Sequence, residues 1–400
     1  MTTGPTKPRI LFYVQHLLGI GHLMRAACLT RALEANGFHV TLVSGGAPVP
    51  GFDSGASRFV QLPPTRAIDV YFKVLVDAQD APIDDVWKAD RRDRLLALYD
   101  DVAPDIVLVE MYPFGRRQMR FEIEPMLERA RTDTRRPVVA ASIRDILVEP
   151  DKPERVDEMV ERVERFFDLV LIHGDPSLIP FDRTFPRMRE IASVSHYTGY
   201  VVDPPPPAGG PGAPGFGEVV VSTGGGAVSE DLLDAAIGAR PLSSLADVPW
   251  RVLVGHNLPE TQFARWRNTA PVGVTVERAR TDFVTLLRNC TLSISQGGYN
   301  TVLEILATGA RAVCLPYAGG HESEQTIRCR LLAARGALEL VEPADVSAAA
   351  VAAAADRAIA GKPAAAAIDT GGARKTAELL QAALDRRKSA NGNDHAGLPG

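Results

Sequence analysis

The segment from Ser295 to Glu304, with the sequence SQGGYNTVLE, constrains the fold of this chain more than any other. The run 291–294 before it is rich in β-forming residues, and apolar residues recur at helical spacing over 302–306 after it. The segment therefore predicts a strand, a turn at Gly297 and Gly298, and a helix. Glycines let backbone N–H groups come close to a ligand, and a helix N-terminus attracts anions.

A second unit of the same kind follows along the chain. Residues 312–315 predict a strand, Pro316 and the Gly319-Gly320 pair predict a loop, and Glu324-Gln325 open another helix. Glu304 lies about one turn into the first helix, where a carboxylate could bind sugar hydroxyls.

These two half-motifs resemble the donor-binding half of a GT-B glycosyltransferase, closest to the MurG-like group of glycosyltransferase family 28. In that group the Gly-rich turn receives the nucleotide diphosphate, the helix carboxylate holds the ribose, and the Glu/Gln pair faces the donor sugar. The resemblance implies that the donor-binding residues of this stretch are Gly297, Gly298, Asn300, Thr301, Glu304, Glu324 and Gln325. The alternative is an ordinary β–α turn that binds no ligand.

Composition limits the possible classes of protein. The chain has 400 residues, of which 46% are hydrophobic and 23% charged, so two soluble α/β domains are expected. The net charge of −5 gives no case for a nucleic-acid partner. No apolar run is long enough to span a membrane, the first residues do not resemble a signal peptide, and the four scattered cysteines show no metal-ligand spacing. A cytoplasmic protein with reduced thiols is expected.

The clearest linker covers residues 203–217, which contain four consecutive prolines and five glycines. We expect a first Rossmann-like domain over 1–202 and a nucleotide-sugar-binding domain over 218–372. The resemblance implies a GT-B fold, with two parallel-sheet α/β domains facing a cleft and a terminal helix over 373–388 that packs back on the first domain. Residues 389–400 are polar and predicted to be disordered.

The first domain opens with a strand over 10–14, a glycine loop ending in Gly21 and His22, and a helix to residue 36. The dinucleotide fingerprint is incomplete, and the next strand does not end in an acidic residue, so an NAD enzyme is disfavoured. The resemblance places this loop near the donor phosphate and the acceptor. His22 could take a proton from an acceptor hydroxyl, or it could cap the helix or contact a phosphate.

Two further strands are followed by charged residues at the sheet edge where open α/β proteins bind ligands. Glu110 ends the strand 105–110 and is followed by Arg116, whereas Arg144 and Asp145 follow the strand 137–142. Glu110 and Asp145 are the other candidate bases, and Arg116 and Arg144 are the candidate acceptor-binding residues. An ion pair between Glu110 and a loop arginine is the structural alternative.

One charge run is interpreted as structural. The predicted helix over 86–102 carries Arg91, Arg92 and Arg94, and we expect these side chains to form a solvated face.

The second domain begins in the same way as the first. A strand over 219–222 precedes Thr223, Gly224 and Gly225, a loop that suits a donor phosphate. Arg278 follows the strand 272–276, at the position where GT-B proteins contact the nucleobase, often through the backbone.

The predicted reaction is glycosyl transfer from a nucleoside-diphosphate sugar to a hydroxyl of a small-molecule or lipid-linked acceptor. No Asp-x-Asp motif occurs, so helix N-termini and loop amides are expected to stabilise the diphosphate without a metal or other cofactor. The resemblance implies inversion, with His22, Asp145 or Glu110 as the base. A nucleotide-sugar 2-epimerase and a non-catalytic nucleotide-binding regulator are the alternatives, and a dehydrogenase is the weakest.

Overall fold

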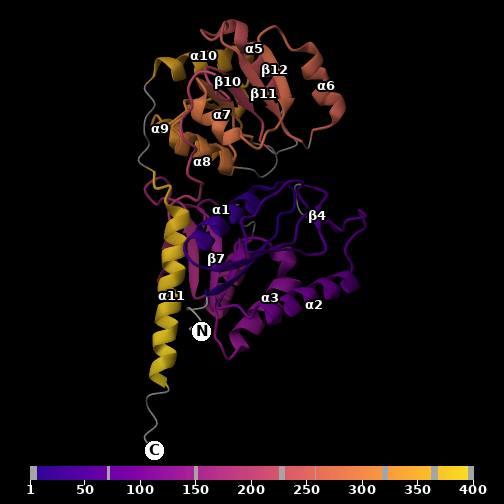
Figure 1. Ribbon diagram of the computed structural model, residues 1–400, viewed down its shortest axis with the longest axis vertical. Coiled ribbons are helices and arrows are strands. Elements are labelled where there is room, and N and C mark those ends of the chain that lie inside the picture. The colour runs from indigo at the N-terminus through magenta and orange to yellow at the C-terminus, as the bar shows by residue number, and fades with distance from the viewer. Residues whose placement is uncertain are drawn as a thin grey trace, which may run out of the picture. The chain divides into compact units, whose positions relative to one another are not determined.

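The computed structural model describes residues 7–69, 73–147, 152–224, 230–256, 258–317, 323–361 and 368–394. The chain forms two compact units, shown in Figure 1. The first unit comprises Met1–Val201 and Asp369–Gly400, and the second comprises Val202–Ile368.

The first unit is built on a seven-stranded parallel sheet in the order β3-β2-β1-β6-β7-β8-β9. The order reverses between β1 and β6, which is the point where open α/β sheets bind ligands. The strands are β1 Arg9–Val14, β2 His39–Ser44, β3 Arg58–Gln61, β6 Ile106–Glu110, β7 Val138–Arg144, β8 Leu169–His173 and β9 Ser195–Tyr197, and a separate antiparallel pair is formed by β4 Arg66–Ala67 and β5 Leu75–Val76.

Helices cover both faces of this sheet, so its central strands β1, β6, β7 and β8 are mostly apolar and buried. The helices are α1 Gly21–Ala35, α2 Asp85–Val102, α3 Arg120–Thr132, α4 Pro153–Phe166 and α11 Gly372–Asp394, with 3₁₀ turns η1 Arg117–Met119, η2 Phe181–Arg183 and η3 Ala192–Val194. In β1, Ile10 and Phe12 join the core under α1 and α11, whereas Leu11 and Tyr13 join the core under α2, α3 and α4. Figure 1 shows α11 and the pair α2 and α3 on opposite sides of β7.

The terminal helix α11 belongs to the first unit and packs on α1 and β7. Backbone hydrogen bonds anchor its start, from Tyr200 N to Asp369 O at 2.7 Å and from Gly372 N to Tyr200 O at 3.0 Å. The helix continues to Asp394, beyond the predicted end at 388 and into the segment expected to be disordered. The reason is that residues 373–390 are mostly strong helix formers, so the helix persists past its last buried contacts.

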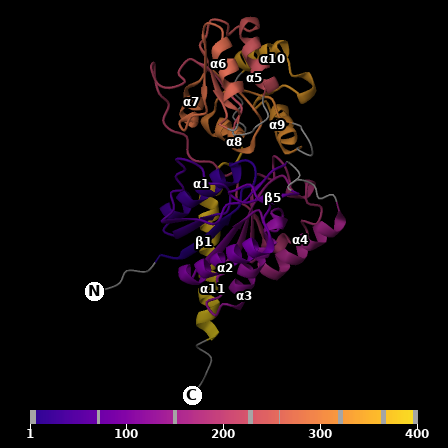
Figure 2. The ribbon, with the colours of Figure 1, turned by 90° about the vertical axis from the view of Figure 1, so that its right-hand side faces the viewer.

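The second unit contains a six-stranded parallel sheet in the order β12-β11-β10-β13-β14-β15. The strands are β10 Val219–Ser222, β11 Trp250–Val254, β12 Val274–Arg278, β13 Leu292–Ser295, β14 Ala312–Cys314 and β15 Glu339–Leu340. The helices are α5 Glu230–Ala239, α6 Glu260–Thr269, α7 Phe283–Asn289, α8 Tyr299–Thr308, α9 Glu324–Ala334 and α10 Ala348–Ala360, with 3₁₀ turns η4 Arg240–Leu242 and η5 Pro343–Asp345. Helices α5 and α10 lie side by side over the main core, as Figure 2 shows.

The proline- and glycine-rich segment 203–217 contains no helix or strand, but it is tied to the second unit. Gly209 N donates to Asn289 Oδ1 at 2.7 Å, and Asn289 Nδ2 donates to Pro214 O at 3.0 Å. The backbone at Gly215 lies so close to Leu286 that a Cβ there would be 2.6 Å from its carbonyl oxygen. The two predicted parallel-sheet α/β domains are therefore present, and the connecting segment packs on α7.

Within the ranges described, no helix combines the length and apolar character that crossing a membrane requires.

Candidate functional site

A buried carboxylate lies at the carboxyl-terminal edge of the first sheet. Glu110 is fully buried at the end of β6, and its register partner on β7 is Ser142. Ser142 Oγ donates to Glu110 Oε2 at 2.6 Å, and Arg25 forms an ion pair with Glu110 Oε1. His22 Nδ1 lies 3.0 Å from the same Oε1. The carboxylate therefore fixes the orientation of the imidazole, whose side chain remains 14% exposed.

Behind Glu110 a hydrogen-bonded chain runs into the core. Ser142 Oγ lies 2.9 Å from His173 Nε2, and His173 Nδ1 lies 2.8 Å from Thr198 Oγ1. Burial lowers the pKa of His173 well below its ordinary value, so this imidazole is neutral. These hydrogen bonds give His173 a structural role, because they support Ser142 and, through it, Glu110.

The electrostatics of His22 favour a neutral imidazole. Burial lowers its pKa well below the usual value, and the charges of Arg116 and Arg144 lower it further. Arg25, which pairs with Glu110, acts on His22 in the same direction. A carboxylate only accepts hydrogen bonds, so Nδ1 of the neutral ring carries the proton and Nε2 is the basic atom.

The other two candidate bases are less accessible. Asp145 is fully buried, and its Oδ2 accepts a hydrogen bond from Tyr200 at 2.6 Å. Gly174 packs directly against it, since a Cβ there would lie 2.4 Å from Asp145 Cβ. Glu110 is buried and hydrogen-bonded on both oxygens. Of the three, His22 alone keeps an exposed fraction at the sheet edge.

The two candidate acceptor arginines lie at neighbouring strand ends. Arg116 donates from Nε to Gln15 O at 2.6 Å and adopts a left-handed backbone conformation with φ 60°. Burial lowers its pKa to about 10, and Arg144, the last residue of β7, is the next cause.

Gly21, a predicted donor-binding residue of the first unit, is exposed at the start of α1, where no side chain caps the helix.

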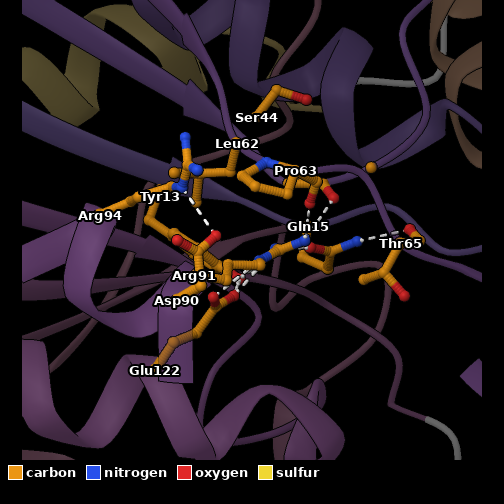
Figure 3. A network of polar contacts seen from close by, with 12 residues as sticks. Tyr13, Gln15, Ser44, Leu62, Pro63, Thr65, Asp90, Arg91, Arg94 and Glu122 are labelled. Carbon is orange, nitrogen blue, oxygen red and sulfur yellow. Dashed lines mark hydrogen bonds and ion pairs between the residues drawn. The ribbon is translucent and has the colours of Figure 1, made fainter. Parts of the chain in front are cut away.

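The arginine run on α2 corrects the sequence interpretation, because Arg91 is fully buried. Arg91 Nε donates to Glu122 Oε2 at 2.7 Å, and its Nη1 donates to Gly45 O at 2.9 Å and to Pro63 O at 2.6 Å. Figure 3 shows this guanidinium between Gln15 and Glu122, with the Tyr13 hydroxyl also bonded to Glu122.

A signal for this burial was present in the sequence. Arg91 continues the apolar stripe of Leu95, Leu98 and Val102 at helical spacing, so it faces the core. Arg92 and Arg94 lie off that stripe, and Arg94 is exposed, as predicted, whereas Arg92 is half-buried.

In the second unit the Gly-Gly turn has one packed glycine and one open glycine. A Cβ on Gly297 would lie 2.4 Å from Cys329 Sγ of α9, whereas a Cβ on Gly298 would meet nothing within 4 Å. Gly298 precedes α8 without a side-chain cap at the helix start. Space beside an uncapped helix N-terminus suits an anion, as the sequence predicts for the diphosphate.

The second half-motif contacts the first directly. The Arg328 guanidinium lies 4.8 Å from the centre of the Tyr299 ring, and its Nη2 donates to Glu324 Oε1 at 2.9 Å. Gln325 Oε1 accepts a hydrogen bond from Tyr317 N at 3.1 Å. Glu324 and Arg328 therefore join the start of α9 to the Gly-Gly turn, a role that spacing alone did not show.

Glu304, which is predicted to bind the ribose, is half-buried on α8. Asn300 and Thr301, one turn before it, are also half-buried. Burial, and then the charge of Asp203, raises the pKa of Glu304 to about 7. A carboxyl group with this pKa is only partly ionised near neutral pH.

The remaining donor candidates are held by structural contacts. Thr223 is buried, and its Oγ1 accepts from Gly255 N at 3.2 Å, while Gly224 has a φ of 63°. Gly225 and the Gly319-Gly320 loop lie outside the described residues. The Arg278 side chain is engaged within the second unit rather than left for a nucleobase, because its Nη1 donates to Gly255 O and Leu258 O, both at 3.0 Å. The backbone of Arg278 remains the proposed nucleobase contact.

Within the described residues, no group of three or more His, Cys, Asp or Glu side chains is arranged to hold a metal ion.

Comparison with known families and structures supports the fold. Residues 219–382 match the model of the glycosyltransferase family 28 C-terminal domain. No curated protein sequence matches the chain. The calicheamicin glycosyltransferase CalG4 is 16% identical with a TM-score of 0.57, covering 95% of this chain and 99% of its own. MurG of Acinetobacter baumannii is 16% identical with a TM-score of 0.53, covering 94% and 100%.

A third solved structure has a nucleotide in its title. The spinosyn rhamnosyltransferase SpnG, complexed with thymidine diphosphate, is 19% identical with a TM-score of 0.55, covering 95% of this chain and 96% of its own. The match and these likenesses agree on the architecture: the chain has the GT-B fold of these glycosyltransferases, and residues 219–382 match the family 28 C-terminal domain.

Proposed function

We propose that this protein transfers a sugar from a nucleoside-diphosphate sugar to a hydroxyl of a small-molecule or lipid-linked acceptor, with inversion and without a metal. The observation that carries the proposal is the pairing of His22 with the buried Glu110 at the edge of the first sheet. Such a pair provides a neutral, oriented imidazole, which a general base requires near neutral pH. SpnG in complex with thymidine diphosphate and VinC in complex with DTDP support a nucleotide donor.

In the proposed reaction, the acceptor oxygen attacks the anomeric carbon as His22 Nε2 removes its proton. The bond between that carbon and the diphosphate oxygen breaks on the opposite side, so the configuration inverts and the nucleoside diphosphate leaves. The imidazolium that forms is stabilised by Glu110, whose position is fixed by Ser142 and Arg25. Removal of Glu110 would leave the cation without its partner.

The donor is proposed to bind the second unit. The open space at Gly298 and the N-terminus of α8 would receive the diphosphate, and Glu304 would bind the ribose. The proposed donor site also includes Asn300, Thr301, Gln325 and the loop that begins at Thr223. Metal independence rests on these helix-end amides and on the absence of an Asp-x-Asp motif from the sequence.

The first test is a screen of nucleoside diphosphates and nucleotide sugars for protection against thermal unfolding. A ligand of the native state at about a hundred times its Kd should raise the Tm by on the order of 5 °C. Glu304→Ala should abolish most of this protection without loss of the fold. Glu342→Ala, which removes a surface ion pair with Arg330 in the same unit, is the matched control. Equal protection of both variants would exclude Glu304 from the donor site.

A second measurement separates transfer from the alternatives. The protective nucleotide sugar is incubated with a library of hydroxyl acceptors in the presence of a chelator, and the product is analysed by NMR for anomeric configuration. Transfer with inversion supports the proposal. Turnover of the donor without any acceptor would favour an epimerase, and binding without turnover would favour a regulator.

A further inference from the structure

A row of buried polar side chains crosses the carboxyl-terminal edge of the first sheet beside the candidate base. Ser142 Oγ lies 2.6 Å from Glu110 Oε2, His173 Nε2 lies 2.9 Å from Ser142 Oγ, and His173 Nδ1 lies 2.8 Å from Thr198 Oγ1. The four residues come from β6, β7, β8 and the segment that follows β9, which are neighbours in the sheet. All four are buried. Ser142, His173 and Thr198 therefore form a buried network that begins at Glu110 and leads away from His22.

The carboxylate at one end of the network determines the direction of each hydrogen bond. Glu110 is paired with Arg25 and, as a carboxylate, only accepts hydrogen bonds, so Ser142 donates its hydroxyl proton to Glu110. Ser142 Oγ must then accept from His173, whose Nε2 carries the ring proton. Burial lowers the pKa of His173 well below its ordinary value, so the ring is neutral and its Nδ1 has no proton. Nδ1 therefore accepts from the hydroxyl of Thr198.

The single proton of the Thr198 hydroxyl has a competing acceptor at the same distance. Thr198 Oγ1 lies 2.8 Å from Gly199 O and 2.8 Å from His173 Nδ1. If the proton went to the carbonyl, His173 would carry its own proton on Nδ1, and Ser142 would donate to Nε2. Glu110 Oε2 would then lose its hydroxyl donor in a buried site. Hydrogen bonds to a charged acceptor are the stronger ones, so the arrangement that serves Glu110 is favoured.

We propose that Ser142, His173 and Thr198 are positioning residues for the base His22. Their hydrogen bonds all run toward Glu110 and hold its Oε2, so that Oε1 faces His22 Nδ1 and leaves His22 Nε2 for the acceptor hydroxyl. The inference rests on the proposed function in one respect, because it takes His22 as the base. It extends the machinery of the reaction to three side chains that are buried behind the base.

The first test reads the positions of the ring protons directly. The native protein is labelled with ¹⁵N-histidine, and long-range ¹H–¹⁵N NMR spectra are recorded at about pH 7.5, where a histidine of ordinary pKa is neutral. The signals of His22 and His173 are assigned from their absence in His22→Gln and His173→Gln. We expect the proton of His173 on Nε2 and the proton of His22 on Nδ1. A His173 ring with its proton on Nδ1 would overturn the proposal, because Ser142 could then not donate to Glu110.

The second test removes the donor next to Glu110. In Ser142→Ala, kcat at saturating substrates should fall about tenfold while both KM values change little, because a mispositioned base affects the reaction and not substrate binding. The charge of Glu110, no longer drawn toward a hydroxyl, acts more strongly on His22 and should raise the pKa of its imidazole. The decline of kcat at low pH should then begin at a higher pH than in the native protein, and NMR titration of His22 should show the same shift. The other groups that act on the pKa of His22 are unchanged in this variant, namely Arg25, Arg116, Arg144 and His16.

Thr198, at the far end of the network, provides a matched pair of variants. Thr198→Val keeps the shape of the side chain but removes the hydroxyl, and it should lower kcat about threefold or more, whereas Thr198→Ser keeps the hydroxyl and should behave as the native protein does. Thr376→Val is the control outside the network. It removes another buried hydroxyl of the same unit, bonded to Gly372 O at 2.8 Å, and should leave kcat and the titration of His22 unchanged.

The outcomes separate this inference from the proposed function. Ser142→Ala and Thr198→Val variants that lose stability but keep the native kcat and the native titration of His22 would show a purely structural role and overturn the inference. Their glycosyl transfer at the native rate would leave the proposed function standing. The expected ring tautomers and a shifted titration of His22, without transfer to any acceptor, would support the network and refute the transferase proposal.

Discussion

His22 combines two properties that a general base needs, an unprotonated imidazole at neutral pH and a fixed orientation. Its pKa lies well below 6.5 because the ring is buried among cations, so the imidazole stays neutral as the pH falls through that value. At saturating donor, where the ionisation of Glu304 no longer limits binding, kcat should therefore remain flat down to about pH 6.5 and decline only below it. A decline that begins above that pH would contradict the neutral state of His22.

The same residue gives a direct prediction for catalysis. His22→Ala should lower kcat by about 10²- to 10⁴-fold, because general-base catalysis contributes factors of this size. Protection by the donor nucleotide, which the second unit is proposed to bind, should persist. His39→Gln replaces an exposed histidine of the same unit and should leave both quantities unchanged. A His22→Ala variant with native kcat would remove His22 from the mechanism.

At the scale of the element, the turn between β13 and α8 contains one glycine that packs against α9, Gly297, and one that is proposed to face the donor, Gly298. Gly297→Ala should destabilise the protein by about 1–3 kcal/mol, because its Cβ would overlap Cys329 Sγ, which is fully buried. Gly298→Ala meets no atom within 4 Å and should change stability by less than about 1 kcal/mol, but should reduce protection by the donor nucleotide. Denaturant unfolding, with and without nucleotide, measures both effects.

The two glycine variants serve as controls for each other. If Gly298→Ala binds the nucleotide as tightly as the native protein, the diphosphate does not approach this helix end. If Gly297→Ala is as stable as the native protein, α9 moves more easily than its buried contacts indicate.

At the scale of the whole molecule, the chain returns to the first unit through α11. Leu380 is fully buried in the core that α11 shares with α1, so Leu380→Ala should destabilise the first unit by about 2–5 kcal/mol. Calorimetry should show a lowered transition for the first unit, and the transition that a nucleotide raises should be unaffected. The control Arg374→Ala removes an exposed pair with Glu378 and should have little effect.

The sequence by itself determined the alternation of strands and helices, the glycine turns and the strand-end position of Glu110. These features depend on local signals, since hydrophobic periodicity and glycine conformations act over a few residues. The helix over 86–102 was predicted within one residue of α2. The resemblance to family 28 rested mainly on the local stretch 297–328, which lies inside the matched domain.

Only the tertiary structure decided which charged side chains are buried and which partners they have. Arg91 was interpreted as solvated because its partner Glu122 lies 31 residues away and Gln15 lies 76 residues away. Likewise, His22 and Glu110 are 88 residues apart and meet because β1 and β6 are neighbours in the sheet. A buried charge is stable only beside groups that compensate it, and the order of strands in the sheet determines which groups those are.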